Sequence, residues 1–226
     1  AQGGRKYLNG IGKLWKRSDT TGGLRDYLDL VVRFNASGNL DHYPGSAWFA
    51  SQLLRNTDRL CLFDTHADVI DQLQGAFAGQ DNVEASKEDG YTASLSRLPP
   101  REQSSLVLID PPYSRVSDYS VAIATLGEAV RRCAFGVYTL WYPVVDRRRI
   151  DTLQNAVCAG AIADSKLFEL SICGDSDDGG MTGCGMLLVN PPPGLSEEME
   201  SVLPYLLDVL GDPRTGSYRI EGLAGG

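Results

Sequence analysis

The sequence has few of the residues that hold metals or form disulfide networks. Its 226 residues include five cysteines and only two histidines, His42 and His66. The cysteine count is odd and no two cysteines have C-x-x-C spacing, which argues against a disulfide framework and against a zinc site. We therefore expect reduced, mostly buried thiols and no metal.

Long apolar segments are also missing. No run of about 18 apolar residues occurs, and the first ten residues, AQGGRKYLNG, lack the apolar core of a signal peptide. An apolar content of 42% and a charged content of 22% are ordinary for a soluble globular protein. We expect a cytoplasmic protein without a membrane segment, folded as one domain with an insertion.

Positive charge is scarce, since the formal net charge is -8. Such a balance fits poorly with binding duplex nucleic acid through phosphate contacts alone. Residues 1–33 differ, because they hold seven lysines and arginines against three aspartates. This segment is either a solvated helix face or the part of the protein that meets phosphate.

Hydrophobic periodicity changes along the chain. Residues 1–36 have helical spacing around Leu24 to Phe34, and Ser46 is placed to act as the N-cap of the next helix. From Leu60 short apolar strands alternate with helical segments, and the last two strands have no helix between them. The expected strands are 60–63, 83–85, 106–109, 137–142 (ended by Pro143), 166–173 and 186–190; the expected helices are 24–34, 47–54, 69–77, 121–130 and 150–157.

This alternation predicts an α/β fold. Strands joined through helices imply right-handed crossovers and a largely parallel sheet with helices on both faces. The glycine-rich connection Gly180–Gly185 suggests a turn with close backbone approach between two antiparallel closing strands.

Three of the predicted strands end on or just before an acid: Asp64, Asp89 and Asp110. Ligands of open α/β sheets bind at the carboxyl ends of the strands. Three such acids in successive units indicate a nucleoside-type ligand laid across the sheet edge, with one carboxylate near the reacting centre.

The stretch Asp110-Pro111-Pro112-Tyr113 is suited to an exocyclic amine on a planar base. A carboxylate and a rigidly held proline carbonyl would accept hydrogen bonds from the NH2 group and direct its lone pair at an electrophile. Tyr113 would stack on a base turned out of its helix. The alternative is a strand that merely ends in a turn.

These four residues match the [D/N/S]-P-P-[Y/F/W] signature of methyltransferases that modify amino groups with S-adenosylmethionine. Longer strings are similar to the RlmJ-type methyltransferases of 23S ribosomal RNA adenine across essentially the whole chain. They are YPGS at 43–46, DPPYSRVSDY at 110–119, LWYPVV at 140–145, GMTGCGMLLVNPP at 180–192 and VLPYL at 202–206.

The resemblance implies a Rossmann-like class I methyltransferase fold with an N-terminal helical insertion. Residues 1–42 would form the helical subdomain and residues 43–226 the Rossmann-like domain. The family also has a first strand and a glycine-rich Asp-Thr-His-Ala-Gly-x-Gly loop. Asp64-Thr65-His66-Ala67 matches the start of that loop, but Asp68-Val69 follows where glycines are required. We therefore expect the given sequence to lack this strand and loop, either because the protein is truncated or because that part of it is not included in the sequence.

The resemblance further implies N6-methylation of adenine in 23S rRNA by a protein expected to be monomeric, with S-adenosylmethionine as cofactor, S-adenosylhomocysteine as product and no metal. Asp64 stands where the family has Glu, so its ribose contact is expected to be longer or water-mediated. Asp110 would be the catalytic acceptor; Pro111 and Tyr113 would bind substrate; and Ser46, Asp64, Asp89, Gly90 and Asp110 would bind the cofactor.

Two other readings stay open. The Asp-Pro-Pro-Tyr motif is expected to contact the base and not the sugar, and adenine occurs in both RNA and DNA. A DNA adenine-N6 methyltransferase is therefore the alternative enzyme. A non-catalytic, methyltransferase-like RNA-binding module is favoured by the lack of the glycine-rich loop and opposed by the retained motif. An oxidoreductase is least favoured, because no G-x-G-x-x-G follows a strand.

Overall fold

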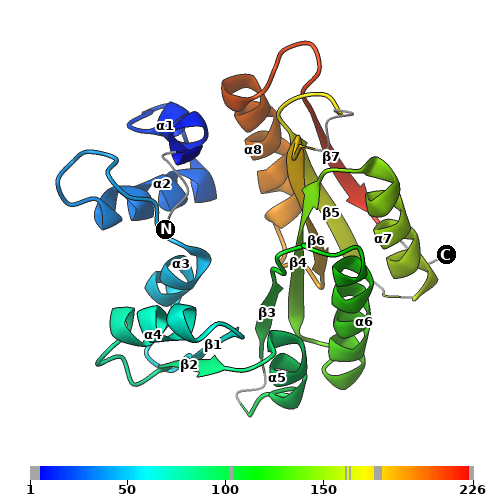
Figure 1. The fold of residues 1–226 in the computed structure, drawn as a ribbon. Helices are drawn as coiled ribbons and strands as arrows, with labels where there is room; N and C mark the ends of the chain where they lie inside the picture. The colour runs from blue at the N-terminus through cyan, green and yellow to red at the C-terminus, as the bar shows by residue number, and fades with distance from the viewer. Residues whose placement is uncertain (1–5, 102–103, 161, 163, 176–179, 224–226) are drawn as a thin grey trace. The chain divides into compact units, whose positions relative to one another are not determined.

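The computed structural model describes residues 6–101, 104–160, 162, 164–175 and 180–223. The chain divides into two compact units, Ala1–Ala93 and Ser94–Gly226, and each is described by itself (Figure 1). The predicted domain boundary after residue 42 stays a prediction.

The first unit begins with helices. The 3-10 helix η1 (Lys6–Asn9) and the helices α1 (Ile11–Leu14), α2 (Gly22–Phe34) and α3 (Ser46–Leu53) follow in order. Leu28 and Val31 are buried on one side of α2. The buried Asn35 amide donates to the carbonyls of Val31 and His42, and thereby fixes the loop that follows the helix.

The prediction that Ser46 caps α3 is wrong. Ser46 is the first helical residue, and Gly45 occupies the N-cap position without a side-chain hydrogen bond. Gly45 has an extended backbone conformation, which an N-cap requires and glycine adopts readily.

A parallel two-stranded sheet completes the first unit. Strand β1 (Leu60–Asp64), helix α4 (Ala67–Ala76) and strand β2 (Val83–Lys87) form a β-α-β unit, in which Leu60 pairs with Val83 and Asp64 with Lys87. Helix α5 (Gly90–Ser96) follows β2 and crosses into the second unit.

The second unit contains a five-stranded mixed sheet with the order β3-β4-β6-β5-β7. The prediction of a largely parallel sheet is wrong for this unit, because only the β3–β4 pair is parallel and its other pairs are antiparallel, as predicted for β5 and β6. Strand β6 follows β5 without a helix between them, so it returns antiparallel and lies between β4 and β5. Its elements are β3 (Leu106–Ile109), α6 (Ser117–Arg132), β4 (Val137–Val144), α7 (Arg147–Ala159), β5 (Ser165–Ser171), β6 (Gly183–Val189), α8 (Leu195–Leu210) and β7 (Ser217–Gly222).

Helices cover both faces of this sheet, as predicted (Figure 1). Tyr138, Leu140 and Tyr142 of β4 alternate along the strand and are fully buried on the face of α6 and α7. On the other face, Phe168 and Leu203 belong to the apolar cluster between the sheet and α8. The period of two in the strands and the amphipathic helices thus produce the expected α/β layers.

Two local predictions need correction. Strand β4 does not end at Pro143 but continues to Val144, with Pro143 opposite Cys184 of β6. Pairing with β3 ends at Leu140, so from Trp141 onward β4 has only one partner, and an edge position tolerates the missing N–H. Gly183 belongs to β6 and not to a turn.

Among the described residues, no helix combines the length and the apolar character needed to cross a bilayer.

Candidate active site

Strand β3 delivers Asp110 to the carboxyl edge of the second unit's sheet. Asp110 follows Ile109, the last residue of the strand, and its side chain is open to solvent. No hydrogen bond to its carboxylate occurs within the described part of the chain. Partial burial raises the pKa of this carboxyl group, and its access to water limits the rise. Asp110 is therefore an acceptor with no partner inside the described protein.

The two prolines after Asp110 fix the direction in which the chain leaves the sheet. Pro111 is buried and Pro112 is exposed. Proline has a locked φ and no N–H, so this bend does not depend on backbone hydrogen bonds. The predicted role of Pro111 requires a rigidly held carbonyl, and this bend is compatible with that requirement. The contact of the Pro111 carbonyl with substrate stays a prediction.

Tyr113 is held in a conformation that non-glycine residues seldom adopt. Its φ is 49°, in the left-handed region, which costs about 1–2 kcal/mol. The Tyr113 hydroxyl donates to the Trp141 carbonyl at 2.5 Å, and its ring centroid lies 4.4 Å from that of Tyr119. Contacts from β4 and α6 thus stabilise the strained loop.

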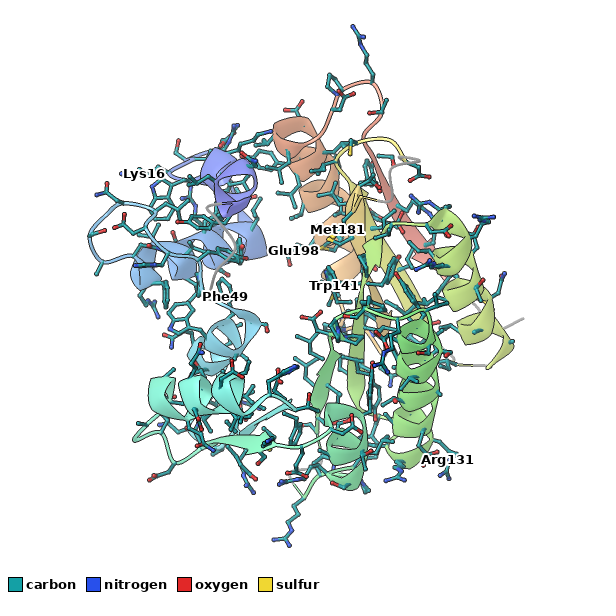
Figure 2. The ribbon with its side chains drawn as sticks, in the orientation of Figure 1. Lys16, Phe49, Arg131, Trp141, Met181 and Glu198 are labelled. Carbon is teal, nitrogen blue, oxygen red and sulfur yellow. The ribbon has the colours of Figure 1, made fainter. Side chains whose placement is uncertain are left out.

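Tyr119 and Trp141 were missed as site residues, although both lie inside the strings DPPYSRVSDY and LWYPVV. The Trp141 ring is half-buried, with its centroid 6.0 Å from that of Tyr113 (Figure 2). Two aromatic rings therefore surround Tyr113, and its predicted stacking on a base stays a prediction.

The first unit places Asp64 and Asp89 at one edge of its parallel sheet. Asp64 ends β1, and its carboxylate accepts from the backbone N–H of His66 at 2.8 Å. Burial alone would raise the pKa of Asp64, but the hydrogen bonds from His66 outweigh it and lower the pKa. Asp89 follows β2 and accepts from the hydroxyl of Thr92 at 2.7 Å, which lowers its pKa. Both groups are kept ionised.

Ser46 and Gly90 belong to the same unit as these acids. Ser46 is exposed at the start of α3, a helix that contacts β1. A Cβ atom on Gly90 would lie 3.6 Å from Cβ of Phe63, an ordinary contact, so packing alone does not require glycine here. Four of the predicted cofactor-binding residues thus belong to the first unit: Ser46, Asp64, Asp89 and Gly90. Asp64, Asp89 and Gly90 lie at or just after the carboxyl ends of the paired strands β1 and β2. Asp110, Pro111 and Tyr113 are brought together within the second unit.

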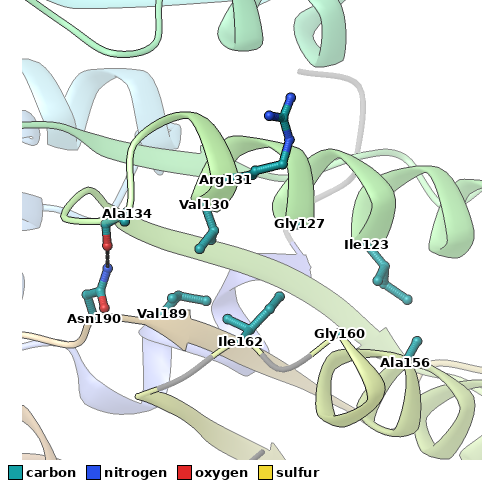
Figure 3. Close-up of a pocket in the computed structure, with 10 residues that line it drawn as sticks. All are labelled: Ile123, Gly127, Val130, Arg131, Ala134, Ala156, Gly160, Ile162, Val189 and Asn190. Carbon is teal, nitrogen blue, oxygen red and sulfur yellow. Dashed lines mark hydrogen bonds between the residues drawn. The ribbon is translucent and has the colours of Figure 1, made fainter.

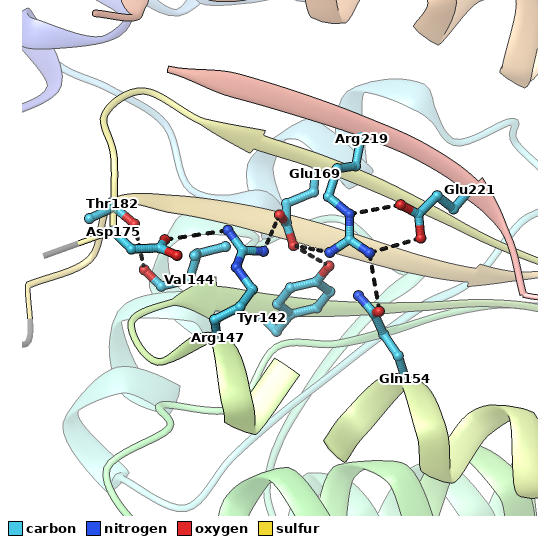
Figure 4. Close-up of polar contacts among 9 residues, drawn as sticks. All are labelled: Tyr142, Val144, Arg147, Gln154, Glu169, Asp175, Thr182, Arg219 and Glu221. Atoms are coloured by element: carbon cyan, nitrogen blue, oxygen red, sulfur yellow. Dashed lines mark hydrogen bonds and ion pairs between the residues drawn. The ribbon is translucent and has the colours of Figure 1, made fainter. Parts of the chain in front are cut away.

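A polar network with a buried carboxylate at its centre joins the start of α7 to the sheet (Figure 4). Glu169 of β5 is only 2% exposed, accepts from the Tyr142 hydroxyl at 3.0 Å and pairs with Arg147 at 2.5 Å. Arg219 of β7 lies 3.7 Å from the same carboxylate. Sequence reasoning missed this network, which connects strand β4 to β5 and β7.

A cavity of about 490 Å3 lies between the C-terminal parts of α6 and α7 (Figure 3). It adjoins the end of β6, which pairs with the start of β4, and so lies at the edge of the sheet opposite the one where Asp110 leaves β3. None of the predicted site residues lines it. Its lining residues are Ile123, Gly127, Val130, Arg131, Ala134, Ala156, Gly160, Ile162, Val189 and Asn190.

Comparison with known proteins identifies the family. A family model described as "Ribosomal RNA large subunit methyltransferase D, RlmJ" matches residues 1–224. The chain belongs to the RlmJ family. The resemblance drawn from the sequence strings is thereby confirmed.

Two relatives are both named ribosomal RNA large subunit methyltransferase J. The one from Escherichia coli strain K12 is 38% identical over 211 residues, which cover 93% of this chain and 75% of the relative. The one from Haemophilus influenzae strain ATCC 51907 is 36% identical over 217 residues, covering 96% and 77%.

A solved structure confirms the fold. The crystal structure of protein LPL1258 from Legionella pneumophila str. Philadelphia 1 matches with a TM-score of 0.90 and 29% identity. The match covers 97% of this chain and 82% of that one. The arrangement of helices and strands described above is thus shared along nearly the whole chain.

Proposed function

We propose that this protein transfers a methyl group from S-adenosylmethionine to N6 of an adenine in 23S ribosomal RNA. The observation that carries the proposal is the environment of Asp110, which directly follows β3. Its carboxylate has no hydrogen-bond partner in the described chain, and the loop that contains it is held by Tyr113. The family match and the names of both relatives support an RNA substrate.

The residues of the first unit fit the proposed cofactor. Ribose hydroxyls and an adenine amine are hydrogen-bond donors, and ionised carboxylates at the carboxyl ends of parallel strands are suitable acceptors. Asp64 and Asp89 are such carboxylates on adjacent strands. Gly90, which packing does not require to be glycine, leaves a surface without a Cβ beside Asp89. We assign ribose to Asp64 and the cofactor adenine to the Asp89-Gly90 pair, with Ser46 nearby.

In the proposed reaction, the protein positions a poorly nucleophilic amine. When bound, S-adenosylmethionine supplies a methyl group on a sulfonium, which is a good leaving group. The Asp110 carboxylate and the Pro111 carbonyl accept hydrogen bonds from the adenine NH2 group and direct its lone pair along the line of displacement. Tyr113 stacks on the base and fixes its plane.

The proton balance assigns a second role to Asp110. As the N–CH3 bond forms and the S–CH3 bond breaks, the nitrogen becomes positively charged and one of its protons leaves. Asp110 accepts that proton, and its raised pKa makes it a better base than an ordinary aspartate. The products are N6-methyladenine in RNA and S-adenosylhomocysteine.

The test compares Asp110→Asn with the unmodified protein in single-turnover methylation of protein-free 23S RNA with labelled cofactor. Loss of a positioned general base typically costs about 10²- to 10⁴-fold. We expect a fall of at least about 100-fold, with a far smaller loss of affinity for S-adenosylhomocysteine in calorimetry. Asp208→Asn, which alters an exposed carboxylate on α8, is the matched control and should methylate normally.

Three results would contradict the proposal. Equal turnover by Asp110→Asn would remove its catalytic role. Transfer to duplex DNA but not to RNA would favour a DNA methyltransferase. Absence of any S-adenosylhomocysteine binding would favour a non-catalytic module.

A further inference from the structure

Three consecutive arginines, Arg147 to Arg149, open helix α7. They follow β4 directly, and β4 is parallel to β3. Parallel strands have their carboxyl ends on one edge of a sheet. The arginines therefore lie at the edge where Asp110 leaves β3.

The three side chains have different surroundings. Arg147 is 30% exposed and pairs with the buried Glu169 at 2.5 Å (Figure 4). Arg148 is 92% exposed and Arg149 42% exposed; they share Asp146 at 3.5 and 3.6 Å. Exposed pairs of this kind contribute about 0–1 kcal/mol, so another anion can replace Asp146 at low cost.

The helix that begins with the three arginines packs beside an aromatic residue of the candidate active site. Helix α7 contacts α6, which carries Tyr119. The Tyr119 ring contacts that of Tyr113 at 4.4 Å between centroids.

A third exposed arginine lies in the loop after Tyr113. Arg115 lies two residues after Tyr113, and its backbone N–H donates to the Asp118 carboxylate at 2.9 Å. The charge at α7 comes from side chains and not from free helix amides, because Asp146 already accepts from the Arg148 N–H at 3.0 Å.

We propose that Arg115, Arg148 and Arg149, here called the arginine patch, bind the phosphates that flank the target adenosine in RNA. The inference rests on the proposed function and assigns the partner of the same site. Guanidinium groups suit phosphate because they form paired hydrogen bonds with its oxygens. On a chain with net charge -8, a local set of exposed cations is needed to hold a polyanion beside Asp110.

The experiment removes two charges from the patch and the same number elsewhere. The variant Arg148→Gln/Arg149→Gln is compared with Arg131→Gln/Arg132→Gln at the C-terminal end of α6 (Figure 2). The probe is a fluorescein-labelled RNA hairpin with an unpaired adenosine in its loop. Its dissociation constant is measured between 50 and 200 mM salt.

Each lost phosphate contact should lower the slope of log affinity against log salt by about 0.7, and both together by about 1.4. We expect the α7 double variant to bind the hairpin at least about tenfold more weakly at low salt. Its affinity for S-adenosylhomocysteine should be unchanged, and its methylation defect should lie in KM more than in kcat. The control variant should match the unmodified protein in RNA affinity and in salt slope.

Arg115→Gln provides a second test outside α7 and should lower the slope by about 0.7. An unchanged salt slope in both patch variants would overturn phosphate binding by the arginine patch. An equal loss of RNA affinity in the α6 control would do the same. Tighter binding of duplex DNA than of RNA would overturn its assignment to RNA. If the unmodified protein methylates no RNA, the proposed function fails, whereas the slopes still decide whether the patch holds phosphates.

Discussion

A single methyl group added at Gly185 should strongly destabilise the second unit. Gly185 of β6 lies between Tyr142 of β4 and Glu169 of β5 in the strand register. The Tyr142 phenol crosses Gly185 to donate to Glu169 at 3.0 Å. A Cβ atom at Gly185 would lie 2.2 Å from Cζ of Tyr142 and 2.3 Å from its hydroxyl oxygen.

The magnitude follows from two losses. The ring must move away from a contact far below van der Waals distance, and such overpacking costs about 1–3 kcal/mol. Moving it breaks a buried hydrogen bond to a carboxylate, which contributes about 1.5–3 kcal/mol. We expect Gly185→Ala to lower the free energy of unfolding by about 3–5 kcal/mol and, at about 2–4 °C per kcal/mol, the Tm by at least about 6 °C.

Thermal and urea unfolding followed by circular dichroism measure this effect. Gly127→Ala is the matched control in the same unit, because no atom lies within 4 Å of a Cβ added there. Replacing a helical glycine by alanine should stabilise by about 0.5–1 kcal/mol. In a Tyr142→Leu background, Gly185→Ala should cost at least about 1 kcal/mol less, since the ring is gone. A Gly185→Ala protein as stable as the unmodified one would refute the reasoning.

Three further predictions concern the candidate active site. Tyr113→Phe loses the hydrogen bond to the Trp141 carbonyl, which contributes about 0.5–1.5 kcal/mol. The kcat should therefore fall about 3- to 10-fold, while the affinity for S-adenosylhomocysteine stays unchanged. An unchanged kcat would show that the hydroxyl does not hold the loop in its active geometry. Because the pKa of Asp110 is raised, kcat/KM should fall on acidification at a pH above the ordinary aspartate value of about 3.9. The folded state binds this proton more tightly than the unfolded state, so ionised Asp110 opposes folding above its pKa; Asp110→Asn should therefore be no less stable at pH 7, and a lower Tm would contradict the assignment.

The positions of the three acids could be predicted from the sequence because the relevant signals are local. Asp64 ends β1, Asp89 follows β2 and Asp110 follows β3, as the apolar runs and turn residues indicated. Short apolar runs that alternate with segments of helical period also predicted the α/β layers. These signals need no knowledge of distant contacts.

Helix α8 and strand β7 were not predicted, and each has a physical reason. Pro204 lies inside α8, where proline ordinarily argues against a helix. In β7, Arg219 occupies the inward position opposite Glu169. A charged residue therefore stands where the alternating pattern of a strand would have an apolar one. A buried partner, invisible in the sequence pattern, makes an arginine suitable for that place.

The conformation of Tyr113 also depends on a distant residue. Its hydroxyl bonds a carbonyl 28 positions along the chain, and its φ of 49° is not a conformation that local preference favours. No short sequence window contains that information. The motif identified the residue types at the site, whereas the fold determines how they are held.

Strand β4 connects the catalytic loop to the buried network through adjacent residues. The Trp141 carbonyl holds the Tyr113 hydroxyl, and the next residue, Tyr142, donates to Glu169 across Gly185. Because the position of Tyr142 determines where the Trp141 carbonyl lies, the glycine in β6 stabilises both the sheet and the strained loop. The polar row across β4, β6 and β5 is thus part of what keeps the loop after β3 in the geometry that the proposed reaction requires.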